Sequence, residues 1–432
     1  MQKALIISYY WPPSGGSGVQ RWMYFAKYLE ENGIEPTVLT IDPIDGAYPA
    51  VDESLLEQVK HVKVIHTSGG FSLVKTYANL KGGSSKNQIP VGDFGNKNKT
   101  IFDRIAGYIR ANYFIPDARV GWNKKAIPVA QKILQNEKFD IVITTGPPHS
   151  THLIGLALRK QFPIHWLADF RDPWREVYYN KVFKRSARSE KKDARLEKEV
   201  LQHADTLLTV GFSTRELLQK KVTDASKVFA ILNGFDSHLF DQTTGKRYDE
   251  FTIAHIGIWT LMQAHQEVFE ALSLLLEEHP TLKVRFVLVG QVHQDIVDGL
   301  QKIERLIVDH RGKQSHAVAI QEIMNADVLL NCLALIPESK ILISGKLMEY
   351  LASGNRVLAI GDPEGDAAQL MNTLPNAKMI APGAVDSIKN TIFEWMQMER
   401  FIPTPSRELT HYSRKETAKQ LAQLIKSRTH VS

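Results

Sequence analysis

Residues 328–354 read VLLNCLALIPESKILISGKLMEYLASG, and this stretch decides how the chain is expected to fold. Its first part, residues 328–335, is apolar apart from Asn331, which is typical of a buried strand. A short loop follows. A helix is then predicted from Ser344, a favoured N-cap residue, to Gly354, a residue type that commonly ends helices. A strand, a loop and a helix in this order form the unit from which parallel α/β sheets are built.

The start of this helix also carries groups that suit a phosphate. Gly345 lets an anion approach the unpaired amides of the first turn, where the positive end of the helix dipole favours negative charge. Lys346 and Glu349 lie three residues apart and share one helix face. Together these groups could hold a nucleoside diphosphate, with phosphates on Lys346 and ribose hydroxyls on Glu349. An ordinary capped helix with a solvated Lys–Glu pair explains the same residues.

The alternation of short apolar strands and helices extends along the whole chain and predicts an α/β fold with parallel sheets. The pattern occurs twice, and 432 residues are enough for two domains of about 200 residues each. We expect an N-terminal domain over residues 1–235, with an irregular loop at 68–100, and a C-terminal domain over 245–402. The final segment, 403–432, is expected to pack back on the N-terminal domain.

Composition limits the class of protein. The chain is 43% hydrophobic and 23% charged, as in soluble globular proteins, and it has no apolar run long enough for a membrane span. Its single cysteine, Cys332, lies in an apolar stretch, and the lack of a disulfide framework predicts a cytoplasmic location. A net charge of +6 without interleaved aromatic residues argues against nucleic acid as a partner.

Two segments could contact an anionic membrane. Residues 181–198 are rich in lysine and arginine, which is typical either of a solvated helix face or of a surface that attaches to anionic lipid. Residues 101–113 combine aromatic and basic side chains, and a buried amphipathic helix explains them equally well. A peripheral position at the inner face of the membrane is therefore one possible location.

Loops that follow predicted strands hold the candidate residues in the first half, because ligands of parallel sheets bind beyond the carboxyl ends of the strands. Gly15 and Gly16 let the backbone approach a ligand at a helix start, and Arg21 on the first turn could face a phosphate. A plain tight turn is the alternative. His149 follows a later strand, where a neutral imidazole could exchange a proton near pH 7, although lone histidines are usually structural.

The third such loop reads Asp169-Phe170-Arg171-Asp172-Pro173-Trp174. Two carboxylates beside an arginine are costly to hold together unless they are paired or bind a ligand. An internal Asp–Arg clamp is the alternative, and it would use at most one of the two acids. The chain has no D-x-D, no H-E-x-x-H and no clustered cysteines and histidines, so no metal site is expected. It also lacks G-x-S-x-G, which argues against an α/β-hydrolase.

Taken in order along the chain, these motifs resemble the family 4 glycosyltransferases of bacterial surface-polysaccharide pathways. The motifs that carry the resemblance are Pro12-Pro13 with Gly15-Gly16, Pro147-Pro148-His149-Ser150, residues 169–174, Asn233-Gly234-Phe235-Asp236 and residues 344–350. The resemblance implies a GT-B fold, in which two Rossmann-like domains face each other across a cleft. It also implies retaining transfer of a sugar from a nucleotide-sugar donor, without an obligate metal or a separate cofactor.

The resemblance further implies a role for each candidate residue. The donor would be bound by Gly15, Gly16, Arg21, Gly257, Ser344, Gly345, Lys346 and Glu349. The candidate catalytic residues are His149 and Asp169, and the acceptor side of the cleft would be lined by Arg171, Asp172 and Trp174. The acceptor itself would be a glycan or a lipid-linked glycan.

The chain departs from the family pattern at two places. An acidic pair of the form E-x7-E would have its first member at Ile341, which cannot bind a sugar hydroxyl. The segment after Gly257 lacks the basic residue that relatives place on the diphosphate, and offers Gln263 or His265 instead. Two other functions therefore stay open: a nucleotide-sugar epimerase or hydrolase of the same fold, and a non-catalytic scaffold of a polysaccharide assembly complex.

Overall fold

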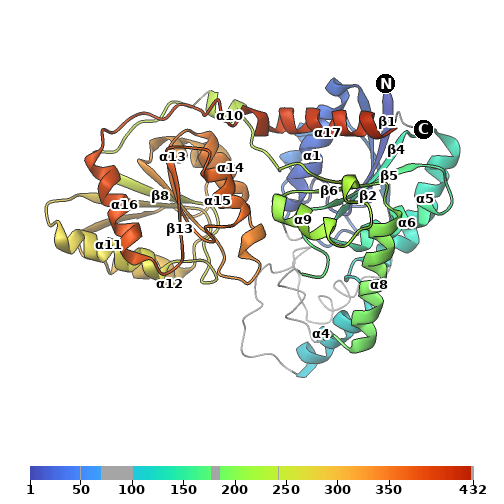
Figure 1. Ribbon diagram of the computed structural model, residues 1–432, viewed down its shortest axis with the longest axis horizontal. Coiled ribbons are helices and arrows are strands. Elements are labelled where there is room, and N and C mark those ends of the chain that lie inside the picture. The colour runs from blue at the N-terminus through green and yellow to red at the C-terminus, as the bar shows by residue number, and fades with distance from the viewer. Residues whose placement is uncertain (49, 70–100, 177–184, 242, 430–432) are drawn as a thin grey trace. The chain divides into compact units, whose positions relative to one another are not determined.

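Figure 1 shows a computed structural model of the chain, which describes residues 1–48, 50–69, 101–176, 185–241 and 243–429. The chain divides into two compact units. The first unit comprises residues 1–233 and 415–432, and the second comprises residues 234–414. Each unit is built on one parallel sheet, so the predicted fold class of two parallel α/β sheets is confirmed. Most of the predicted irregular loop, residues 70–100, lies outside the described residues.

The first unit holds a seven-stranded sheet in the order β3-β2-β1-β4-β5-β6-β7. Its strands are β1 (Gln2–Ile7), β2 (Ile34–Ile41), β3 (Lys63–Thr67), β4 (Ile141–Gly146), β5 (His165–Phe170), β6 (Thr206–Thr209) and β7 (Val228–Ala230). Its helices are α1 (Ser17–Leu29), α2 (Leu55–Gln58), α4 (Ile101–Tyr113), α5 (Asn123–Asn136), α6 (Ser150–Arg159), α8 (Ala187–His203), α9 (Phe212–Gln219) and α17 (Arg414–Thr429). Every strand pairs in parallel with its neighbours, which requires a crossover between consecutive strands.

Both faces of this sheet are buried. In β1, Leu5 and Ile7 point to one face and join a core with side chains of α5, α6 and α8. Ala4 and Ile6 point to the other face, where α1 and α17 cover them. Because side chains alternate along a strand, a strand that is buried on both sides is apolar at most of its positions. This burial explains the continuous apolar runs in the sequence.

The second unit holds a six-stranded sheet in the order β10-β9-β8-β11-β12-β13. Its strands are β8 (Phe251–Ile256), β9 (Val284–Val289), β10 (Leu306–His310), β11 (Val328–Cys332), β12 (Arg356–Ile360) and β13 (Ala377–Ile380). Its helices are α10 (His238–Asp241), α11 (Gln266–Glu278), α12 (Gln294–Gln301), α13 (His316–Asn325), α14 (Gly345–Ala352), α15 (Asp366–Met371) and α16 (Val385–Gln397). One face of the sheet packs against α11, α12 and α16. Helices α13, α14 and α15 contact the strands β8, β11, β12 and β13.

The chain passes between the two units twice. Phe235, just after the first passage, pairs with Ser413, just before the second, and the Arg414 amide donates to the Phe235 carbonyl at 2.8 Å. After the second passage, α17 packs through Leu421 and Ile425 into the core that it shares with α1 (Figure 1). Of the segment 403–432, residues 403–414 therefore belong to the second unit and the remainder to the first.

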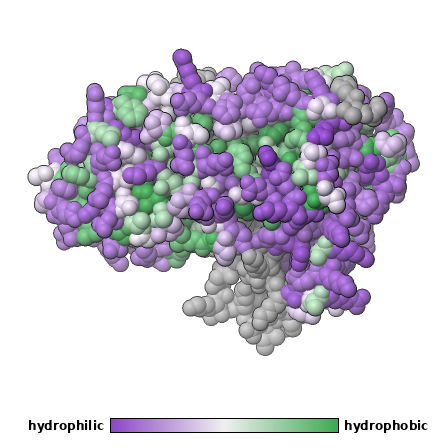
Figure 2. All heavy atoms as spheres, viewed as in Figure 1, coloured by the Kyte–Doolittle hydropathy of each residue, from purple (hydrophilic) through white to green (hydrophobic). Residues whose placement is uncertain are grey.

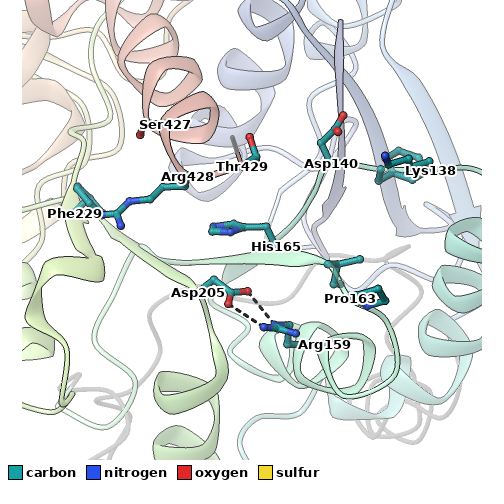
Figure 3. Close-up of a pocket in the computed structure, with 12 residues that line it drawn as sticks. Lys138, Asp140, Arg159, Pro163, His165, Asp205, Phe229, Ser427, Arg428 and Thr429 are labelled. Carbon is teal, nitrogen blue, oxygen red and sulfur yellow. Dashed lines mark hydrogen bonds and ion pairs between the residues drawn. The ribbon is translucent and has the colours of Figure 1, made fainter. Parts of the chain in front are cut away.

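A cavity of about 930 Å³ opens at the amino ends of β4 to β7 in the first unit (Figure 3). Arg159 and Asp205 form a bidentate ion pair at its edge, with N–O distances of 3.0 and 3.1 Å. Arg428 of α17 lies over the Phe229 ring in the same cavity. This is the edge of the sheet opposite to the strand-end loops, and ligands of such sheets bind at the carboxyl edge. We therefore assign the cavity no part in the reaction.

Candidate functional site

The second unit has a topological switch point between β8 and β11. From β8 the chain order runs outward through β9 and β10 on one side, and from β11 through β12 and β13 on the other. The helices that follow β8 and β11 leave the sheet on opposite faces. The crevice that this arrangement forms between two strand ends is where parallel sheets bind ligands. Gly257 ends β8 with a φ of 118°, a backbone conformation that favours glycine. Gly290 ends β9 so close to it that an added Cβ would collide with the Gly257 carbonyl oxygen.

Helix α14 begins beside this point, as the sequence predicted. The Ser344 hydroxyl caps the helix by accepting from the Leu347 amide at 3.2 Å, and it lies 3.2 Å from the Asn331 side-chain oxygen of β11. The first amides of a helix have no intrahelical partner, so those of Gly345 and Lys346 point out of its end. A Cβ at Gly345 would meet no atom within 4 Å, which leaves the helix start open to a ligand.

Lys346 is held at the end of β8. Its ammonium group lies 3.0 Å from Nε2 of His255 and donates to the Ile258 carbonyl at 2.8 Å. Burial lowers the pKa of Lys346 to about 8. Since an ammonium group can only donate, His255 accepts on Nε2 and carries its proton on Nδ1. Burial and the charge of Lys346 keep the pKa of His255 well below its ordinary value, so the ring stays neutral.

His255 is a functional candidate that the sequence analysis missed. Its side chain is fully buried, its Nδ1 has no hydrogen-bond partner among the described residues, and its ring stacks on Trp259 at 4.4 Å. The sequence feature that could have indicated His255 was its position two residues before Gly257, at the end of a strand. The contact with Lys346 joins residues 91 positions apart, however, and no local pattern reveals it.

Glu349 lies on the next turn of α14. Its Oε1 forms an ion pair with Nε2 of His316 at 3.2 Å, and its side chain is 22% exposed. The neighbouring Tyr350 is buried and fixes the helix to β8, because its hydroxyl accepts from the Ile256 amide and donates to the Ile256 carbonyl. The structure thus brings Gly257, Ser344, Gly345, Lys346 and Glu349 together at one edge of the second sheet. We call this group the α14 site.

The loop after Gly257 does not supply a replacement for the absent basic residue. Gln263 donates to the Cys332 carbonyl at 2.7 Å and accepts from the Thr260 amide, so its side chain is used to fold the loop. His265 bonds to the Gln263 carbonyl at 2.7 Å. The loop instead exposes apolar side chains beside the α14 site, namely Ile258, Leu261 and Met262, together with Leu335 from the loop after β11.

In the first unit, Arg21 and Asp169 form a buried clamp, and this corrects the roles expected for both. The guanidinium of Arg21 donates to both oxygens of Asp169 and to the Ile231 carbonyl, and the two side chains are 1% and 0% exposed. Asp169 also accepts from Trp22 at 2.6 Å and from Thr145 at 2.9 Å. With all of these partners inside the protein, neither side chain is available to a phosphate or an acceptor hydroxyl. The clamp ties α1 to β4, β5 and β7.

His149 is also enclosed. It is 6% exposed, neither ring nitrogen has a hydrogen-bond partner among the described residues, and the ring stacks on Trp174 at 5.1 Å. Burial holds the pKa of His149 well below its ordinary value, and the nearby His152 and Arg171 lower it further. The imidazole is therefore neutral near pH 7. Unsatisfied nitrogens on a buried ring are rare in folded proteins, and they leave His149 able to bind a ligand group that reaches it.

Two other residues expected on the acceptor side, Arg171 and Trp174, form hydrogen bonds within the first unit. Arg171 donates to the carbonyls of Gly18, Gly146 and Pro147, and so joins the loop after β1 to the loop after β4. Trp174 is 1% exposed and donates to Asp193 of α8 at 2.9 Å, so it belongs to the core. Asp172 is half-buried. A direct contact of Trp174 with an acceptor is not compatible with this burial.

Gly15 and Gly16 form the turn before α1, in which Gly15 is buried and Gly16 is exposed. The Gly15 amide donates to the Ala50 carbonyl at 2.9 Å, and Gly16 adopts a φ of 94° as the residue before the helix. A Cβ at Gly16 would meet no atom within 4 Å. Gly16 therefore presents open backbone at the start of α1, whereas Gly15 is packed against Ala50 and Asp52. Within the described ranges, no helix is long and apolar enough to cross a membrane.

Comparisons with known proteins agree with this architecture. Residues 94–239 match the model of Glycosyltransferase Family 4. A glycosyltransferase from Rickettsia africae has 14% identity and a TM-score of 0.63, with both chains fully covered. HepE from Anabaena, solved in complex with UDP-glucose, has 12% identity and a TM-score of 0.54, covering 100% of this chain and 98% of its own. The lipopolysaccharide outer core galactosyltransferase WaaB has 13% identity and a TM-score of 0.57, covering 99% and 100%. No curated protein sequence matches the chain.

Proposed function

We propose, from the premise that this chain is a family 4 glycosyltransferase with the GT-B fold, that it transfers a sugar from a UDP-sugar to a glycan or lipid-linked acceptor in cell-surface polysaccharide synthesis. The observation that carries the proposal is the α14 site: an open, capped helix start with a half-buried lysine at the switch point of the second sheet. The choice of uridine as the base rests on HepE, a structural neighbour that binds UDP-glucose.

The α14 site would act on the leaving group. In sugar transfer the bond between the sugar and the diphosphate breaks, and negative charge grows on the departing phosphate. Lys346 and the amides of Gly345 and Lys346 supply fixed positive charge at that place, which stabilises the transition state more than the ground state. Glu349, one turn along the same helix, would accept hydrogen bonds from the ribose hydroxyls. The acceptor hydroxyl would attack on the face of the leaving group, which retains the configuration of the sugar.

The first unit would supply the acceptor side. The open backbone at Gly16 would approach the diphosphate, with Gly15 fixing the turn behind it. The neutral ring of His149 would donate or accept a hydrogen bond toward the reacting sugar. The Arg21–Asp169 clamp and Arg171 would contribute by fixing the loops after β1 and β4, because preorganised loops reduce the cost of orienting a substrate.

Two elements of the first unit support a membrane-linked acceptor. Arg188, Lys191, Lys192, Arg195 and Lys198 of α8 are exposed, and Figure 2 shows a largely hydrophilic surface in this region. Tyr108 and Tyr113 of the adjoining α4 are 54% and 72% exposed. The two helices are joined by Asn112, whose side chain accepts from the Ser186 amide at 2.7 Å. Exposed bases attract anionic lipid, and exposed tyrosines suit the interfacial region.

Calorimetric titration with UDP tests the donor assignment. Lys346→Ala and Glu349→Ala are each expected to weaken UDP binding at least tenfold, because each removes a charged group that would touch the ligand. Lys302→Ala and Glu304→Ala, which change exposed charged residues of the same unit, serve as matched controls and should bind as the unaltered protein does. Equal affinity of all four variants would refute the α14 site as the donor site.

The two alternative functions predict different results with the donor. An epimerase or hydrolase would convert a UDP-sugar with no acceptor present, so product analysis after incubation with the donor alone separates it from a transferase. A scaffold would bind no nucleotide in the same titration. The absence of an acid at Ile341 is the observation that motivates the scaffold, whereas the intact Lys346 and Glu349 favour the transferase.

A further inference from the structure

The donor site contains one charged residue that the family resemblance did not indicate, His316. It is the first residue of α13, a helix whose N-cap is Ser315, and its side chain is 56% exposed. Helices α13 and α14 follow different strands of the same sheet, β10 and β11, and both begin at its carboxyl edge. His316 and Glu349 are 33 positions apart in sequence and 3.2 Å apart in space.

His316 is the one side-chain partner of Glu349 among the residues that the structure describes. The contact uses Oε1 of the carboxylate and leaves Oε2 without a bond. Without this contact no side-chain hydrogen bond or ion pair among the described residues would fix the carboxylate of Glu349. His316 therefore determines the plane in which the carboxylate faces the site.

The surroundings of His316 favour its charged form. The hydrogen bond that His316 donates to Glu349 raises the pKa of His316, and burial lowers it. The charges of Glu349 and Asp236 raise this pKa and that of Arg414 lowers it, with a net increase. An imidazolium donates from Nε2 and cannot accept, so the pairing with Oε1 has a defined direction. The positive charge also offsets the carboxylate, which would otherwise repel an incoming diphosphate one helical turn away at Lys346.

We propose that His316 orients Glu349 so that its free oxygen accepts the ribose hydroxyls of the donor nucleotide. This inference rests on the proposed function, because it assumes that the α14 site binds a nucleoside diphosphate. With phosphates at Lys346 and the helix start, the ribose lies toward Glu349, which shares a helix face with Lys346. A carboxylate that is already fixed loses less freedom when it binds the diol, and so binds it more tightly. His316 is a positioning residue and need not touch the ligand.

The test compares UDP with 2′,3′-dideoxy-UDP, which has the same base and the same ionisable phosphates but lacks the ribose diol. The preference for UDP, measured as the ratio of the two dissociation constants by calorimetry, reports on the diol alone. We expect the unaltered protein to prefer UDP at least tenfold. His316→Ala should lose most of this preference with little change in the affinity for the dideoxy compound, and His316→Gln, which keeps a donor, should recover part of it.

A double-variant cycle shows whether the two residues act together. Glu349→Ala should abolish the preference, and adding His316→Ala to it should change nothing further. In the unaltered protein the preference should fall as the pH rises above the raised pKa of His316, and this step should be absent from His316→Gln. His293→Ala, which removes another histidine at a helix start of the same unit paired with an acid, is the matched control and should leave the preference intact.

The outcomes separate the two claims. A preference that is lost in Glu349→Ala but kept in His316→Ala overturns the role of His316 alone. Equal weakening of both ligands by His316→Ala overturns it as well, because the histidine would then act on the packing of α13 and not on the diol. Absence of UDP binding by the unaltered protein, or a preference that survives Glu349→Ala, overturns the donor assignment itself.

Discussion

Lys346 is the residue on which the proposed chemistry depends most, because it brings a positive charge to the first turn of α14. Its ammonium group rests against a neutral histidine and a carbonyl, both of which can accept but neither of which carries a full charge. Burial without a counter-ion explains why its pKa falls to about 8. A diphosphate would provide the missing negative charge.

This lowered pKa predicts a pH dependence of donor binding. A half-buried lysine with a pKa of about 8 is mostly charged at pH 7 and mostly neutral at pH 9, and only the charged form attracts the diphosphate. The affinity for UDP-glucose, whose phosphates do not titrate in this range, should therefore fall about tenfold between pH 7 and pH 9. Lys346→Arg, which keeps its charge, should abolish the dependence. A flat profile in the unaltered protein would contradict it.

The residue scale also shows what a sequence cannot reveal. The positions of Ser344, Lys346 and Glu349 at a helix start could be predicted because a helix start is a local pattern, set by neighbours within one or two turns. Arg21 and Asp169 are 148 positions apart, and each looked like a ligand contact only because its partner was unknown. A charged side chain is ambiguous until the fold shows whether another charge neutralises it.

At the scale of single elements, α14 combines a structural and a chemical role. Ser344 caps the helix, and the same turn presents the amides that would meet the diphosphate. Tyr350 fixes the other side of the helix to β8 through two hydrogen bonds to Ile256. Ser344 and Tyr350 thus together fix the start of α14 relative to the end of β8.

Removing the Ser344 cap of α14 should lower both the stability of the protein and its affinity for UDP. Removing a helix cap in the first unit should lower stability alone. Ser344→Ala is expected to cost about 1 kcal/mol of stability, because the Leu347 amide loses its partner. It should also weaken UDP binding several-fold, since the first turn becomes less ordered. Ser186→Ala removes the corresponding cap of α8, which lies in the first unit. It should lower the melting temperature and leave UDP affinity unchanged, and thermal unfolding with titration measures both effects.

At the scale of the whole molecule, the two-sheet architecture could be predicted well. Strands buried on both faces need uninterrupted apolar runs, and such runs are visible in a single sequence. The positions of the strands within each sheet could not be predicted in the same way. They depend on contacts such as that between β1 and β4, which joins residues far apart in the sequence.

The charge of α8 leads to a prediction about the intact protein. It should sediment with phosphatidylglycerol vesicles at low salt and be released at high salt, because each exposed base contributes about 1 kcal/mol near an anionic surface. The triple change Lys191→Glu, Lys192→Glu and Arg195→Glu should weaken sedimentation at least tenfold. The control Lys302→Glu, Lys313→Glu and Lys378→Glu makes the same change in net charge on exposed residues of the second unit. An equal loss of sedimentation in both variants would show that vesicle binding depends on net charge alone and not on α8.

The return of α17 to the first unit has a consequence for biosynthesis. Ala418, Leu421 and Ile425 complete the core around α1, yet they are made after the whole second unit has been translated. On the ribosome the first unit must therefore wait, with the apolar surface of α1 uncovered, while the second unit can close first. Loss of α17 alone would leave an early-made domain permanently unfinished, so residues of α1 and α17 that are synthesised far apart in time share one folding event.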